Sequence, residues 1–90
     1  MSDLADGAAR DALILRLKRI EGQLRGIQKM IEEGERCEAV AQQMSASRKA
    51  LDKAFFYMVA CAIEQADAAP EKEGGLEGRK RVAEMLARFA

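Results

Sequence analysis

The strongest constraint on the fold is a row of aliphatic residues in the first third of the chain. Between residues 13 and 31 a large aliphatic side chain recurs at alternating intervals of four and three residues. The members of this row are Leu13, Leu17, Ile20, Leu24, Ile27 and Ile31. Such spacing places the side chains on one side of an α-helix, where they can pack against another helix. The pattern predicts a helix over residues 9–33 that ends at Gly34.

A second row with similar spacing predicts a longer helix. Its members are Val40, Met44, Ser47, Leu51, Ala54 or Phe55, Met58 and Ala62. We expect this helix to cover residues 37–68 and to stop before Pro70, because proline disfavours helical continuation. At 1.5 Å per residue it would be roughly 45 Å long. With only one long partner it would expose an apolar surface made of Phe55, Phe56, Met58, Val59 and Ile63. We therefore expect two copies of the hairpin to pair as an antiparallel four-helix bundle.

The two ends of the chain are predicted to contain one further, short helix. Residues 1–8 are expected to form a flexible arm, residues 71–75 a loop, and residues 76–89 a short third helix. The apolar face of this third helix consists of Val82, Met85, Leu86 and Phe89. The sequence therefore predicts a single all-α domain over residues 1–90, with three helices in each protomer.

The composition excludes several classes of function. The chain contains no His, which removes the commonest general base and the commonest metal ligand. It also lacks a Cys-x-x-Cys motif and a glycine-rich phosphate loop, so we expect no enzyme. Acidic and basic residues balance at 15 each, and no apolar run approaches membrane-spanning length. The absence of an export signal and the two cysteines predict a cytoplasmic protein with reduced thiols and no membrane partner.

Charge is distributed unevenly despite the neutral total. Between residues 12 and 29 the basic residues are opposed only by Glu21. They are Arg16, Lys18, Arg19, Arg25 and Lys29. A solvated helix face is the simplest interpretation of such a stretch. In a two-fold dimer, however, the patch would occur twice, and symmetric proteins bind duplex phosphates in this way. Since no helix-turn-helix signature is present, binding would depend on backbone contacts and DNA shape as well as on base edges.

The two cysteines lie 24 residues apart on one predicted helix. The rise of about 36 Å prevents Cys37 from reaching Cys61 within a protomer. An antiparallel partner crossing near Lys49 would bring Cys37 of one chain beside Cys61 of the other. The side chains are about 120° apart on a straight helix and about 50° apart on a supercoiled one. Cys37 begins its helix, which favours a reactive thiolate, whereas Cys61 also fits a packing role.

Two stretches carry a resemblance to a known family. The sequence RLKRIEGQLRGI (16–27), followed by a helix end and Cys37, and then QQMSASRKAL (42–51), resembles the copper-sensing operon repressor (CsoR) family. The similarity covers about residues 10–66. It implies an all-α dimer of antiparallel hairpins, assembled into a disc-like tetramer, that represses transcription and releases operator DNA when its effector binds. The DNA-contacting residues implied by the resemblance are Arg16, Arg19 and Arg48, with Lys18 and Lys53 as secondary candidates.

The resemblance also bears on the effector, because family members sense copper, nickel or cobalt, formaldehyde, or persulfide. Cys37 matches the family's sensing cysteine. In copper sensors a His and a second Cys follow, 25 and 29 residues later, where this chain has Ala62 and Ala66. Nickel and cobalt sensing requires nitrogen-rich coordination. Formaldehyde sensors use the N-terminal amine beside an early Pro or similar residue, whereas this chain begins Met-Ser-Asp.

The persulfide sensors are the closest functional match, because they use two cysteines and no metal. Their second cysteine falls at the position of Ala66, so Cys61 comes five residues early. We therefore expect a repressor without a cofactor whose sensing thiols, Cys37 and Cys61, react with reactive sulfur species. One alternative is Cu(I) held by the same two thiolates, with Met58 or a small molecule completing the site. Another is a helical scaffold without a DNA role.

Overall fold

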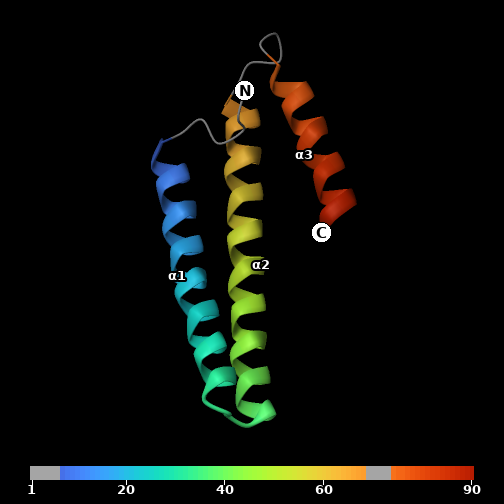
Figure 1. Cartoon of the computed structure of the whole chain (residues 1–90). Helices are drawn as coiled ribbons and strands as arrows, with labels where there is room; N and C mark the ends of the chain where they lie inside the picture. Colours follow the sequence, from blue (N-terminus) through green and yellow to red (C-terminus); the bar gives the residue numbers. More distant parts are fainter. Residues whose placement is uncertain (1–6, 69–73) are drawn as a thin grey trace.

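The computed structural model describes residues 7–68 and 74–90, which form three helices. These are α1 (Gly7–Glu32), α2 (Cys37–Ala68) and α3 (Gly75–Phe89). Helices α1 and α2 form an antiparallel hairpin, and α3 lies beside the C-terminal half of α2, on the side away from α1 (Figure 1). The described ranges contain no β-strand. The prediction of an all-α, three-helix protomer is confirmed.

Helix α2 has the expected bounds, and α3 ends where expected. Both ends of α1 and the start of α3 differ from the expected positions by one or two residues. Gly7 and Ala8, expected in the flexible arm, already belong to α1, and Gly75, expected in the loop, begins α3. The remaining residues of the arm, 1–6, lie outside the described residues, as does the range 69–73, which includes Pro70.

Helix α1 ends as the sequence predicts, with Gly34 in the left-handed conformation at a φ of 75°. The Gly34 N–H donates to the Ile31 carbonyl at 3.1 Å, and the Glu35 N–H donates to the Met30 carbonyl at 2.9 Å. This pair of bonds is a Schellman motif, which satisfies the last carbonyls of a helix and favours glycine at the left-handed position. The motif ends α1 and allows α2 to return antiparallel to it.

Each heptad row contains both buried and exposed members. On α1, Ile20 and Ile27 are buried, whereas the large residues between and beside them are exposed. On α2, Ser47 is likewise buried. The exposed members of the two rows are Leu17, Leu24, Ile31, Met44 and Leu51. The division arises because a row with alternating spacing of three and four residues faces two directions, and the hairpin supplies a partner in only one of them.

Helix α3 supplies α2 with a second partner. Val59, Ala62 and Val82 form a buried cluster, with Phe55, Met58, Met85 and Leu86 packed against it. Close approach is possible because Gly78 faces Ala66: a Cβ at Gly78 would lie 3.2 Å from the Ala66 Cβ. The expectation that Phe55, Met58 and Val59 would be exposed is therefore wrong: Val59 is buried in this cluster, and Phe55 and Met58 are partly buried against it. Phe56 and Ile63 remain 54% and 38% exposed.

The protomer is elongated and has a thin core. Its principal extents are 58 × 26 × 15 Å, and its radius of gyration is 17.1 Å. A compact domain of this length would have a radius of gyration of about 12 Å. No large side chain among the described residues is less than 2% exposed. The antiparallel dimer and the disc-like tetramer stay predictions, for which the exposed members of the two rows provide an apolar surface.

Candidate functional site

Three of the basic residues singled out from the sequence meet at one small groove between α1 and α2. Arg16 and Arg19 reach it from α1, and Lys53 reaches it from α2. We call it the basic groove: it has a volume of about 130 Å³ and is lined by Arg16, Arg19, Ile20, Gln23, Ala50 and Lys53. The three cationic side chains are exposed. Two arginines and one lysine thus line a single solvent-accessible groove, which suits an anionic ligand.

An aromatic ring contacts one of the arginines that line the basic groove. The Arg16 guanidinium carbon lies 4.7 Å from the centroid of the Tyr57 ring, within the range of a cation–π interaction. Tyr57 follows Lys53 by four residues, and it is half-buried. The sequence alone does not single out Tyr57. The available signal was its helical register, which places it on the same side of α2 as Lys53.

A polar contact joins the two helices beside this groove. The Ser47 hydroxyl donates to the Gln23 amide oxygen at 3.1 Å, and Ser47 is 5% exposed. The two residues belong to the two sequence stretches that carry the family resemblance. The sequence alone does not indicate that these two residues are paired. The signal for the pair was a serine within an otherwise apolar row, because a buried hydroxyl requires a hydrogen-bond partner.

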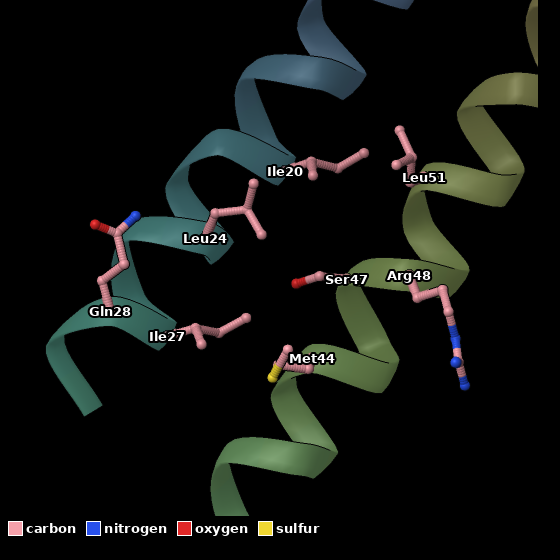
Figure 2. Close-up of a pocket in the computed structure, with 8 residues that line it drawn as sticks. All are labelled: Ile20, Leu24, Ile27, Gln28, Met44, Ser47, Arg48 and Leu51. Atoms are coloured by element: carbon pink, nitrogen blue, oxygen red, sulfur yellow. The ribbon is translucent and has the colours of Figure 1, made fainter. Parts of the chain in front are cut away.

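The other two basic candidates lie apart from the basic groove. Arg48 lies at the edge of a larger groove of about 430 Å³, and Lys18 is exposed on α1. We call this larger space the apolar groove; it is lined by Ile20, Leu24, Ile27, Gln28, Met44, Ser47, Arg48 and Leu51. Figure 2 shows the aliphatic side chains reaching into the space between the helices, whereas the side chain of Arg48 extends away from it.

The apolar groove continues toward the hairpin turn. Met44 also lines a neighbouring groove of about 340 Å³, together with Ile31 and Cys37. Leu24, Met44 and Leu51 are each about half exposed, at 47%, 56% and 51%. Exposed apolar side chains gathered along one face favour contact with another apolar surface. Cys37 thus lies at one end of a face that is suited to a protein partner.

The two cysteines are free thiols in contrasting surroundings. Cys37 is the first residue of α2 and is exposed, whereas Cys61 is 9% exposed. Cys61 continues the seven-residue spacing of the buried residues Ser47 and Ala54, which places it on the side of α2 that faces α1. Because α2 is one continuous helix, the cysteines stand about 36 Å apart along it. The structure does not bring them together within one protomer.

No group of three or more His, Cys, Asp and Glu residues among the described residues is arranged to hold a metal ion. Ala62 and Ala66, which occupy the positions of the second and third copper ligands implied by the resemblance, are buried at 3% and 7% exposure. Ala66 lies against Gly78 of α3. None of the described helices has the length and hydropathy needed to span a membrane.

Comparison with known proteins places the chain among transcriptional repressors. The family model for metal-sensitive transcriptional repressors matches residues 9–89. The copper-sensing transcriptional repressor CsoR of Bacillus subtilis (strain 168) is 34% identical over 80 residues, covering 89% of this chain and 77% of that protein. The copper-sensing transcriptional repressor RicR of Mycobacterium tuberculosis (strain ATCC 25618 / H37Rv) is 35% identical over 81 residues, covering 90% and 84%. No solved structure gives a significant match.

These matches confirm the resemblance identified from residues 16–27 and 42–51. They also confirm that the chain belongs with regulators and not with enzymes. The match extends beyond the stretch in which the resemblance was visible, because it includes the whole of α3. This chain is a member of the metal-sensitive transcriptional repressor family.

Proposed function

We propose that the protein is a cytoplasmic repressor that binds double-stranded operator DNA, and that modification of Cys37 together with Cys61 of the partner subunit releases it. The observation that carries the DNA-binding part is the basic groove, in which two helices present Arg16, Arg19 and Lys53 together. Exposed guanidinium and ammonium groups bind phosphates and release counterions from the duplex. In the proposal Arg48 and Lys18 provide additional contacts outside the groove.

The partner subunit in this proposal is a second copy of the chain. The exposed residues of the apolar groove, Leu24, Met44 and Leu51, favour such a copy because each helix of the hairpin leaves part of its row uncovered. An antiparallel crossing near Lys49 would place Cys37 of one chain near Cys61 of the other. The two-fold axis would produce two such pairs, and two dimers would form the disc-like tetramer.

The effector in this proposal is a reactive sulfur species such as a low-molecular-weight persulfide. The Cys37 thiolate attacks its terminal sulfur, displaces the small thiol and becomes a persulfide. The thiolate of Cys61 of the partner subunit then attacks the inner sulfur of Cys37. A disulfide forms and hydrosulfide leaves, so that two thiols are oxidised and the transferred sulfur is reduced. The exposure of Cys37 favours it as the residue that reacts first.

Release of DNA would follow from the position of Cys61. This side chain is buried, and its seven-residue spacing from Ser47 and Ala54 indicates that it faces α1. The same helix pair holds the basic groove. A disulfide to another chain requires the Cys61 sulfur to leave its buried position. We expect α1 and α2 to shift against each other as it does so, which changes the spacing of Arg16 and Lys53.

Cu(I) is the second candidate effector, favoured by the description of both relatives as copper-sensing repressors. Thiolates are the soft ligands that Cu(I) prefers. Cys37 and Cys61 of the partner subunit would supply two of them, and Met58 or a small molecule would supply a third ligand. We rank this candidate second because the chain contains no His and only two cysteines.

Intact-mass spectrometry under denaturing, non-reducing conditions separates the two effectors. Reduced protein is treated anaerobically with a sulfane-sulfur donor, and a parallel sample is titrated with Cu(I) against a strong chelator. We expect a covalent dimer linked through Cys37 and Cys61, which is absent after substitution of either cysteine by Ala. Unmodified monomer from a preparation that binds Cu(I) tightly and then loses DNA affinity would contradict the sulfur proposal in favour of the copper one.

A further inference from the structure

We propose that Tyr57 is a positioning residue for DNA binding: its ring holds the Arg16 guanidinium at the basic groove. This inference rests on the proposed function, because it assumes that Arg16 contacts DNA phosphates. It goes further by assigning a role to an aromatic residue outside the set of cationic side chains. Tyr57 itself is not required to touch the DNA.

The geometry of the pair supports this role. The Arg16 guanidinium carbon lies 4.7 Å from the Tyr57 ring centroid. At this distance a cation is attracted by the negative face of the ring. Arg16 lines the basic groove from α1, whereas Tyr57 belongs to α2, so the interaction joins the two helices at the groove. A stacked guanidinium remains beside the groove instead of sampling the many rotamers open to an exposed arginine.

Buried residues lie one turn away from both Tyr57 and Arg16. Ala54, one turn before Tyr57, is 1% exposed, and Ile20, one turn after Arg16, is 7% exposed. The backbones that carry the two side chains are therefore held by buried contacts. Restricting Arg16 in the free protein lowers the entropy that must be lost when it binds a phosphate, which strengthens binding without adding a contact.

The chain contains a matched pair elsewhere. The Arg88 guanidinium carbon lies 5.3 Å from the Phe89 ring centroid at the end of α3. Helix α3 packs on α2, and its described residues make no contact with α1. Removing the Phe89 ring therefore disrupts an arginine–aromatic contact away from the basic groove.

The test measures affinity for a duplex selected by the wild-type protein from a random library, using fluorescence anisotropy. We expect Tyr57→Leu to weaken binding roughly three- to ten-fold, and Tyr57→Phe to bind within about two-fold of wild type because the ring face is retained. Phe89→Leu should leave affinity unchanged. In an Arg16→Gln background, Tyr57→Leu should cause no further loss, because its effect passes through Arg16.

A second comparison protects the test against misfolding of Tyr57→Leu. Lysine keeps the charge but lacks the planar group that stacks. We therefore expect Arg16→Lys to weaken binding more than Arg19→Lys, and neither exposed substitution threatens the fold. Any of three results would overturn the role of Tyr57. The first is an equal loss of affinity in Arg16→Lys and Arg19→Lys, and the second is an additive loss in the double variant Arg16→Gln/Tyr57→Leu. The third is a Tyr57→Phe variant that binds as weakly as Tyr57→Leu. Wild-type affinity in Arg16→Gln would instead refute the proposed DNA contact of Arg16, and the inference with it.

Discussion

Replacement of Arg19 by Gln should weaken DNA binding in a salt-dependent manner while leaving the fold intact. Arg19 is exposed on α1 and lines the basic groove. Substitutions at such surface positions change the free energy of unfolding by no more than about 0.5 kcal/mol. Each phosphate neutralised by a cation contributes about 0.9 to the slope of log affinity against log salt concentration. If two protomers related by a two-fold axis bind one duplex, the variant loses two contacts and its slope becomes shallower by about 1.8.

The assay is fluorescence anisotropy on the selected duplex at salt concentrations between about 50 and about 200 mM. The matched control is Arg88→Gln, which removes the same charge from an exposed position on α3, outside the basic groove. We expect the slope of the control to equal that of wild type. Equal changes in both variants would mean that binding responds only to net charge, and an unchanged slope for Arg19→Gln would refute the assignment of the basic groove.

Three further predictions concern the thiols and the packing of the helices. Alkylation of the reduced native protein should modify Cys37 before Cys61, because only Cys37 is exposed. Peptide mass spectrometry gives the order of modification, and equal rates at the two cysteines would contradict the burial of Cys61. Gly34→Ala should lower the free energy of unfolding, measured by urea denaturation, by about 1 kcal/mol, since an alanine is strained at a φ of 75°. The control Gly26→Ala lies inside α1 and should not lower this free energy. Val82→Ala should cost about 2 kcal/mol, because it opens a gap in the buried cluster on α2; a cost near zero would mean that α3 is not docked.

The elements could be predicted from the sequence because their signals are local. The alternating spacing from Leu13 to Ile31 requires only helical geometry, and Gly34 marks the end of α1 because a left-handed residue is needed there. The arrangement of the elements could not be predicted in the same way. Periodicity shows that Ile20 and Leu24 share a side of the helix, but only the position of α2 decides that the first is buried and the second exposed.

The docking of α3 depends on residues far apart in the sequence. The contact between Gly78 and Ala66 requires both residues to be small, and neither residue alone indicates its partner. Periodicity on α2 therefore overestimated its exposed surface around Val59.

Part of the candidate site could be predicted from residue type and family resemblance. Arg16, Arg19 and Lys53 were identified as cations, and the structure brings them to one groove. Tyr57 was missed because an aromatic residue in an apolar helix indicates packing until its contact with a specific cation is known. The approach of Cys37 to Cys61 depends on an assembly that the protomer does not contain, so it stays a prediction.

The most direct test of the central claim is to follow a preformed complex of the protein and its selected duplex after anaerobic addition of a sulfane-sulfur donor. We predict that the anisotropy of the labelled duplex falls to the value for free DNA, that a dithiol reductant restores it, and that Cys37→Ala abolishes the response. A complex that persists after mass spectrometry shows Cys37 fully modified would contradict the account, above all if Cu(I) releases the same DNA.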